Sequence, residues 1–533
     1  MTRATPAARL VLAAILLGGV TLLLTALTRG LSPSLIEADE GGHYVNALFL
    51  GDWLRAGFPS PLTFARDFYA HFPRLTIGHW PPGWYMLEAP LFALWRPSPL
   101  ATGYLSAFLS GLPGIGIVWA FARLERPRAG LALGVGYAVL PLVVDSARYL
   151  LVDQPLALVV ALAAMAWVAA SERPTWPRML GFALLSAACP LIKGNGALVA
   201  LVPAIDVALT GRWRLLRRPA LWGAAILALA IVGPWYWLSF AISAEGFNYA
   251  PGLPYAWLAL STNAATVLAS IGVAGVGLAA AGLLSLTSRV GADERRVARL
   301  AVAVVVATFV FQSAVPASLA PRYMTPALPW IVVLAGLGLL HVSRIAVIGR
   351  PVAAALAVAA LVPAATVLAT LPPKPDIGAP RLARAMVAHG GLWLVDGPSG
   401  AEGALIAAVA HADAGRRRVW VGRASQWLST SDFMGRGYRL TAADPAAVRG
   451  VLDRIGAAGI VSVALHDRLA FAHSRLLLSA VNMPAYRTAT RRFYAGDGTV
   501  TMAIRRAAVA PNVALLATDG GSAKVAKMTG ALR

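Results

Sequence analysis

Apolar residues of this chain fall into long runs separated by short polar segments. A helix needs about 20 apolar residues to cross the hydrocarbon core of a bilayer. The predicted spans are 10–28, 100–122, 129–147, 154–170, 179–192, 195–210, 219–240, 263–287, 300–318, 324–342 and 351–371. Two shorter runs, on either side of Lys193-Gly194-Asn195-Gly196, are expected to form a helical hairpin. The pattern predicts a polytopic α-helical membrane protein with about 11 transmembrane helices.

The composition supports a membrane protein. Of 533 residues, 58% are hydrophobic and 13% charged, which is more apolar surface than a soluble protein of this size could bury. The net charge of +22 is dispersed over helix ends and the C-terminal tail, so we expect no nucleic-acid partner. Cys189 is the single cysteine, so neither a disulfide framework nor a thiolate metal site is expected.

The distribution of basic residues predicts the orientation. The N-terminus and the loops near 122–129, 171–178, 211–218, 288–299 and 341–350 carry 17 Lys or Arg. The short loops on the other side carry three: Arg148, Lys193 and Arg322. By the positive-inside rule, the N-terminus is cytoplasmic and the tail extracytoplasmic. The richness in Ala, Gly, Arg and Pro is typical of bacteria with GC-rich genomes, so a bacterial plasma (inner) membrane is expected.

Two domains are predicted, a transmembrane domain over 1–371, with a first outer loop at about 29–99, and an extracytoplasmic α/β domain over 372–533. The candidate buried strands of the tail are 392–396, 418–421 and 460–465, with helical patterns at 400–414 and 443–456. A hairpin of 486–494 and 499–506 is expected around Gly496-Asp497-Gly498.

An acidic pair, Asp39-Glu40, opens the first outer loop. One carboxylate could accept a proton from an acceptor hydroxyl while the other orients it or holds a divalent cation such as Mg²⁺ or Mn²⁺. The alternative is that Asp39 caps a short helix that begins at Glu40. Capping requires neither two acids nor the neighbouring His43, so we favour a catalytic role.

Other polar residues of the outer face complete a candidate cavity. The rigid segment His79-Trp80-Pro81-Pro82 leads into a helix that carries Tyr85, and its aromatic residues could line a site or anchor the protein at the interface. A membrane-edge loop carries Arg148 and Asp153; Asp153 could instead cap a helix. Three cations could bind a phosphate: Lys193, Arg148 and Arg322, the last beside Tyr323. For Lys193 the alternative is snorkelling to the interface.

Together these residues resemble the integral-membrane glycosyltransferases of the GT-C class, in particular the protein O-mannosyltransferase and aminoarabinose-transferase branch (family 39-like). The resemblance covers roughly 10–371 and rests on Asp39-Glu40, the His79-Trp80-Pro81-Pro82 segment, the Arg148/Asp153 loop, Lys193-Gly194 and Pro321-Arg322-Tyr323. One departure is that family members often have Glu-Lys where this chain has His79-Trp80. The metal-binding role of that Glu and the phosphate-binding role of that Lys are therefore not expected here.

The resemblance implies transfer of a sugar, with inversion, from a polyprenyl-phosphate donor to an extracytoplasmic acceptor such as a glycolipid, an envelope glycan or a protein hydroxyl. Asp39 would be the general base, Glu40 its support or a metal ligand, and Lys193, Arg148 or Arg322 would neutralise the departing phosphate. His43, His79, Trp80, Tyr85, Asp153 and Tyr323 would line the substrate cavity. The alternatives are a lipid-linked sugar transporter or flippase, and a non-catalytic envelope scaffold.

Overall fold

The computed structural model describes residues 5–518, apart from Ser288, 346–348, Phe433, Asp467 and 493–496. Seven of its described helices are long and apolar enough to cross a membrane. These are α1 (Pro6–Leu27), α5 to α6 (Pro99–Arg123), α9 (Asp153–Glu172), α12 (Pro219–Ala244), α13 with η4 (Leu253–Leu286), α14 (Ala292–Ala314), and α16 with α17 (Gly349–Thr370). The polytopic helical class is therefore confirmed.

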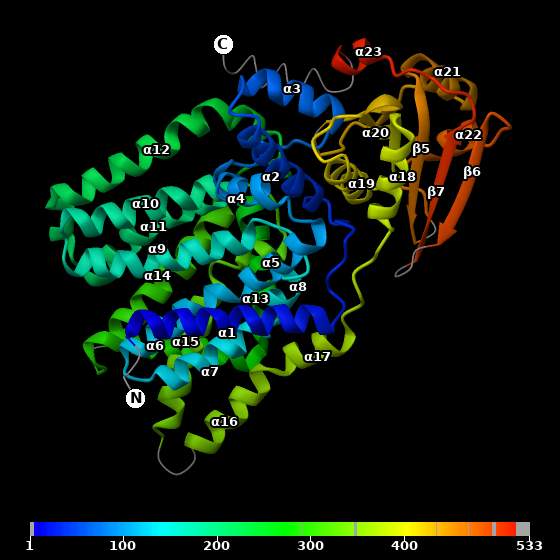
Figure 1. The fold of residues 1–533 in the computed structure, drawn as a ribbon. Helices are drawn as coiled ribbons and strands as arrows, with labels where there is room; N and C mark the ends of the chain where they lie inside the picture. Colours follow the sequence, from blue (N-terminus) through cyan, green and yellow to red (C-terminus); the bar gives the residue numbers. More distant parts are fainter. Residues whose placement is uncertain are drawn as a thin grey trace.

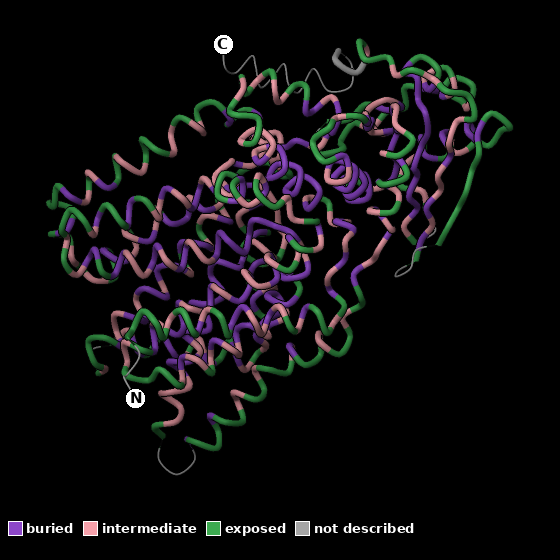
Figure 2. The backbone as a smooth tube through the Cα atoms, viewed as in Figure 1, coloured by how far each residue is buried: buried purple, intermediate pink, exposed green. Residues whose placement is uncertain are grey.

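Four further apolar segments are shorter. They are α10 (Trp176–Ile192), η2 with α11 (Gly194–Thr210), α15 (Leu328–Ser343) and the pair α7 (Pro127–Ala138) and α8 (Pro141–Ser146). Proline has no N–H and disfavours helix in the residue before it, which accounts for the break before Pro141. Every predicted span overlaps a helix, although 315–318 lies beyond the end of α14 and 325–327 precedes α15. The number of helices that cross the membrane remains a prediction. Figure 2 shows the buried residues in the centre of the bundle, whereas α12 and α16 are largely exposed along their length.

The segment predicted to be the first outer loop folds into three helices that pack against this bundle: α2 (Glu40–Arg55), α3 (Pro61–His71) and α4 (Gly83–Trp95). Helix α3 begins with Pro61, which suits a first helical turn because its N–H would be unpaired there in any case. Asp39 stands at the N-cap of α2, but its side chain makes no capping hydrogen bond. The capping interpretation of Asp39 is therefore not supported.

The C-terminal part contains a five-stranded sheet of order β2-β1-β5-β7-β6. Its strands are β1 (Gly391–Asp396), β2 (Val419–Arg423), β5 (Ala457–Leu465), β6 (Tyr486–Arg492) and β7 (Gly498–Arg505). Strands β2, β1 and β5 are parallel, and β7 and β6 are antiparallel. The predicted strands and hairpin are present, although Gly496 of the expected turn lies outside the described residues. The domain boundary at 371/372 remains a prediction.

Helices and a short strand pair surround this sheet. They are α18 (Ala379–His389), α19 (Ser399–Ala412), α20 (Ala424–Trp427), α21 (Pro445–Ile455), α22 (Ala472–Val481), α23 (Val513–Thr518), β3 (Ser429–Thr430) and β4 (Arg439–Leu440). The predicted helices at 400–414 and 443–456 correspond to α19 and α21. Figure 1 shows α19 between the sheet and α2, on the side of the bundle that carries the first loop.

Glycines allow α19 to approach α2 closely. A Cβ atom on Gly41 would lie 2.5 Å from the backbone carbon of Gly403, and one on Gly400 would collide with the carbonyl oxygen of Ile36. Real Cβ atoms do not make such contacts, so only glycine fits at these positions. The C-terminal domain is thereby packed directly against the helix that follows Asp39.

Candidate active site

A cavity of about 2090 Å³ runs between the helical bundle, the first loop and the C-terminal domain. One part is a groove between α10, α11 and α12 with apolar walls. Its lining includes Phe182, Val207, Leu221, Leu229 and Val232. The other part is polar and includes Asp39, Arg74, His79, Lys193 and Arg322. An elongated molecule with an apolar tail and an anionic head fits such a cavity.

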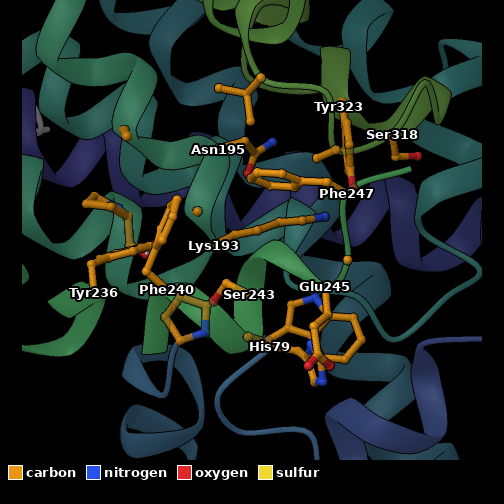
Figure 3. A pocket seen from close by; sticks show the side chains of 18 of the residues that line it. His79, Lys193, Asn195, Tyr236, Phe240, Ser243, Glu245, Phe247, Ser318 and Tyr323 are labelled. Carbon is orange, nitrogen blue, oxygen red and sulfur yellow. Dashed lines mark hydrogen bonds between the residues drawn. The ribbon is translucent and has the colours of Figure 1, made fainter. Parts of the chain in front are cut away.

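The close view of the cavity shows how the polar groups converge. In Figure 3, Lys193 extends into the cavity between Asn195 and Tyr323 on one side and His79 and Glu245 on the other. The Lys193 ammonium lies 4.5 Å from the centre of the Tyr323 ring, a cation–π contact. Segments far apart in the sequence therefore supply one polar surface.

Five charged residues form what we call the cavity cluster: Glu37, Asp39, Asp153, Lys193 and Arg322. Arg322 Nη2 donates to Asp39 Oδ2 at 2.8 Å, and Nη1 lies 3.4 Å from Glu37 Oε1. Arg322 Nε lies 3.7 Å from Asp153 Oδ2 and has no hydrogen-bond partner in the described structure. Lys193 Nζ donates to both oxygens of Asp153, at 2.7 and 2.8 Å. The cluster combines the predicted base with two predicted phosphate ligands.

The electrostatics of the cavity cluster follow from its crowding. Burial opposes the charge on Arg322, but Asp153, Glu37 and Asp39 outweigh it and raise the pKa of the guanidinium. Burial, followed by the negative charge of Asp39, raises the pKa of Glu37 to about 7. The side chains of Asp39 and Arg322 keep 25% and 23% of their surface exposed. Both groups can therefore be reached from the cavity.

Glu40 belongs to a separate group, the closed cluster, formed with Lys374 and the backbone of the membrane-edge loop. Lys374 Nζ donates to Glu40 Oε1 at 2.6 Å and to the carbonyl oxygen of Arg148 at 2.8 Å. The amides of Leu150 and Glu37 also donate to the Glu40 carboxylate, at 2.8 and 2.9 Å. The side chains of Glu40 and Lys374 are only 1% and 3% exposed. This carboxylate therefore joins the start of α2 to the membrane-edge loop and to the linker that carries Lys374.

Arg148 lies away from the cavity. Its Nη2 donates to the carbonyl oxygen of Pro372 at 2.5 Å, and the residue is not part of the cavity lining. It therefore joins the membrane-edge loop to the linker that precedes the C-terminal domain. Arg148 is therefore not placed to contact a phosphate in the cavity, in contrast to Lys193 and Arg322.

The predicted aromatic and histidine residues divide into a cavity-lining pair and a buried pair. His79 and Trp80 line the cavity. His43 and Tyr85 are buried, and His43 Nδ1 lies 2.6 Å from the Tyr85 hydroxyl. Burial, assisted by the positive charge of Lys193, lowers the pKa of His43 to about 3, so its imidazole is neutral at physiological pH. His43 stacks edge-on against Trp80 at 5.1 Å and supports the cavity wall.

The residues around Asp39 do not fit a divalent cation well. Glu40, the predicted metal ligand, already accepts hydrogen bonds from protein donors at both oxygens. Within the described parts of the chain, no three His, Cys, Asp or Glu side chains gather as metal ligands. We therefore derive no step through a metal.

Three residues of this region were not predicted as site residues from the sequence: Glu37, Arg74 and Lys374. Arg74 donates to the carbonyl oxygen of Ala38 and, at 3.1 Å, to Ser399 Oγ, so it connects the loop before Asp39 with α19. Glu37 stands only two residues before Asp39, and this spacing was an available signal. Lys374 is the basic residue of a proline-rich linker, a signal that gives no partner.

The fold is that of the GT-C class. Residues 81–237 match the family model described as "Dolichyl-phosphate-mannose-protein mannosyltransferase". The apo crystal structure of ArnT from Cupriavidus metallidurans is similar with a TM-score of 0.56 at 17% identity, covering 92% of this chain and 97% of ArnT. The same protein bound to undecaprenyl phosphate gives 0.51 at 18% identity, with the same coverage.

An archaeal protein shares the architecture as well. The oligosaccharyltransferase AglB from Archaeoglobus fulgidus, in complex with an inhibitory peptide and a dolichol-phosphate, has a TM-score of 0.54 at 12% identity. The match covers 85% of this chain and 69% of AglB. No curated protein sequence matches the chain. The predicted resemblance to GT-C glycosyltransferases is confirmed, and identities this low establish the fold alone.

Proposed function

We propose that the protein is a glycosyltransferase that moves a sugar from a polyprenyl-phosphate donor to a hydroxyl group of an extracytoplasmic acceptor. The observation that carries the proposal is the continuity of one cavity, from an apolar groove to the cavity cluster. The groove suits a polyprenyl chain, and Lys193 and Arg322 suit its phosphate. ArnT and AglB, which share the fold, have structures with undecaprenyl phosphate and with a dolichol-phosphate, respectively.

The contacts suggest how donor binding prepares the base. In the structure, Arg322 is paired with Asp39, and Lys193 with Asp153. A donor phosphate offers these cations further oxygens and thereby weakens the hold of Arg322 on Asp39. Asp39 then accepts the proton of the acceptor hydroxyl, whose oxygen attacks the anomeric carbon. The bond between that carbon and the phosphate oxygen breaks, and polyprenyl phosphate leaves with the electron pair, stabilised by Lys193 and Arg322.

The proposed location follows the distribution of charge. We place the protein in a bacterial inner membrane, with a cytoplasmic N-terminus and with the cavity cluster and C-terminal domain on the outer face. The arginine-rich segments Trp213–Arg217 and the start of α14 would then face the cytoplasm.

The decisive experiment measures transfer by the purified protein in nanodiscs with radiolabelled polyprenyl-phosphate sugars and a membrane extract as acceptor source. Asp39→Asn should reduce transfer by about 10²–10⁴-fold, because the side chain keeps its shape but loses its basicity. Asp497→Asn, at an exposed position of the C-terminal hairpin, is the matched control and should transfer like wild type.

Other outcomes would reassign the protein. Full activity of Asp39→Asn would show that another group is the base. If wild type binds the donor without transferring its sugar, a flippase or a non-catalytic scaffold becomes the better interpretation. Donor movement across proteoliposomes then separates those two functions.

A further inference from the structure

The carboxyl edge of the C-terminal sheet contributes to the same cavity. Strands β1, β2 and β5 are parallel, so their carboxyl ends meet at one edge, where Asp396 pairs in register with Ser462, and Val395 with Arg423. Ligands of open parallel sheets bind outside this edge. The cavity lining includes residues from or beside it: Glu402, Arg423, Ser425, Gln426, Tyr438 and Phe471.

The first polar group at this edge is a nearly neutral ion pair. Glu402 is 1% exposed, and its Oε2 accepts from Arg423 Nε at 2.7 Å and from Ser425 Oγ at 3.1 Å. Among the described contacts, Glu402 engages Arg423 at Nε, and the terminal nitrogens remain as donors on the cavity-lining side chain. A carboxylate beside the guanidinium disfavours an anionic ligand and favours a neutral one that can accept hydrogen bonds.

The second group is a chain of contacts that leads from a buried carboxylate, through His473, to Tyr438 at the cavity. His473 Nε2 lies 3.2 Å from Asp396 Oδ1, and His473 Nδ1 lies 2.9 Å from the Tyr438 hydroxyl. Asp396 and His473 are fully buried, and Asp396 also accepts from Ser462 and Ser474. The negative charge of Asp396, 3.2 Å from Nε2, favours a proton on that nitrogen, so Nδ1 is left to accept from the tyrosine hydroxyl.

This assignment leaves the Tyr438 oxygen able to accept from a ligand. It donates its proton to His473 Nδ1 and accepts the backbone N–H of His473 at 3.3 Å, which occupies one of its two lone pairs. Phe471 stacks on Tyr438, with ring centres 5.6 Å apart and an angle of 22°. Both rings line the cavity, so an apolar surface lies beside the polar groups.

We propose that this edge is a saccharide-binding subsite. A sugar ring is uncharged, its hydroxyl groups both donate and accept, and its C–H face is apolar. Arg423 would supply donors, Tyr438 an acceptor, and the stacked rings the apolar surface. Arg74 connects the two sites, because it lines the cavity and donates both to the carbonyl oxygen of Ala38, beside Asp39, and to Ser399 at the start of α19.

The subsite extends the proposed function, because it gives the C-terminal domain a role in holding one of the two sugars near the cavity cluster. Two sources share this chemistry, the acceptor glycan and the sugar of the donor. Arg423, Tyr438 and Phe471 could bind either sugar, and a competition experiment distinguishes the two sources.

The test is saturation-transfer NMR on the full-length protein in nanodiscs, with methyl α-mannopyranoside and methyl β-arabinofuranoside as probes. Wild type should bind at least one probe. Tyr438→Phe should weaken binding about 3–10-fold through loss of one hydrogen bond, and Arg423→Gln about tenfold. Tyr104→Phe, an exposed tyrosine outside the cavity lining, is the matched control and should bind like wild type.

Competition then identifies the source. If a polyprenyl-phosphate sugar displaces the methyl glycoside, the subsite holds the donor sugar; if both bind together, it holds the acceptor. Either result supports a saccharide subsite. The proposal is overturned if wild type binds neither probe, or if folded Tyr438→Phe and Arg423→Gln, with wild-type unfolding temperatures, bind as tightly as wild type.

Failure of this inference is distinguishable from failure of the proposed function. If transfer requires Asp39 but the Tyr438→Phe variant has the wild-type rate and the wild-type KM for donor and acceptor, the subsite proposal alone is contradicted. If glycoside binding depends on Tyr438 but the protein never transfers sugar, the proposed enzymatic function alone is contradicted.

Discussion

The cavity cluster and the closed cluster start from adjacent residues and differ in almost every physical respect. In the closed cluster, Glu40 and Lys374 are 1% and 3% exposed, and backbone amides complete the hydrogen bonding. In the cavity cluster, Asp39 and Arg322 are about a quarter exposed and border a large cavity. A buried, fully paired carboxylate stabilises a fold, whereas a partly exposed one can exchange partners with a ligand.

The difference follows from the start of α2. Successive helical residues point about 100° apart, so Asp39 and Glu40 face different surroundings although they are neighbours in the chain. Asp39 faces the cavity and Glu40 faces the linker. The comparison predicts that substitutions in the closed cluster reduce stability, whereas those in the cavity cluster reduce transfer.

The largest effect is expected for Glu40→Gln. Loss of the carboxylate leaves the ammonium of Lys374 buried without its counter-ion, which costs about 3–5 kcal/mol of unfolding free energy. Thermal unfolding in detergent measures the loss. The double variant Glu40→Gln, Lys374→Met is the control and should recover part of the stability. A Glu40→Gln protein as stable as wild type but inactive in transfer would place Glu40 in the catalytic machinery instead.

Arg322→Gln should follow with a decrease in transfer of about 10²–10³-fold, because it removes a positive charge from the departing phosphate. Arg148→Gln is the matched control, since Arg148 contacts the linker and lies outside the cavity lining. Initial rates per folded protein measure both. Equal losses in the two variants would contradict the separation of the clusters.

The smallest effect concerns pH and Glu37. Its pKa rises from 4.5 to about 7, so the folded protein binds more protons than the unfolded chain between these values. The free energy of unfolding of wild type should therefore fall, relative to Glu37→Gln, as pH rises from 4.5 to 7, by about 1–3 kcal/mol. Unfolding temperatures of both proteins across this range test the sign. Parallel curves would show that Glu37 titrates normally.

Much of the fold could be predicted from the sequence because membrane-spanning helices require long apolar runs, and buried strands and amphipathic helices have characteristic hydrophobic periodicities. The apolar runs and the three parallel strands appear in the structure near the predicted positions. Asp39, Lys193, Arg322, Asp153 and Tyr323 lie close together, although Asp153, predicted to line the cavity, is buried and is not part of its lining. Such groups could be predicted because charges at a membrane edge need partners or a ligand.

Partners across long sequence separations could not be predicted. Glu40 pairs with a lysine 334 residues away, and Arg148 contacts a carbonyl group 224 residues away. The role of the C-terminal domain was equally hidden, because Tyr438 and Arg423 carry no motif that distinguishes them from other surface residues.

The sequence by itself determined that this chain crosses a membrane, roughly where its apolar helices and buried strands lie, and which residues carry unusual charge at the membrane edge. Hydrophobicity and local conformational preference are properties of short segments, and they need no knowledge of the rest of the chain. Only the tertiary structure decided which charged side chains are buried in ion pairs and which face the cavity. It also packed α19 of the C-terminal domain against α2, the helix that follows Asp39, because the close approach of Gly41 and Gly403 depends on how two distant helices pack.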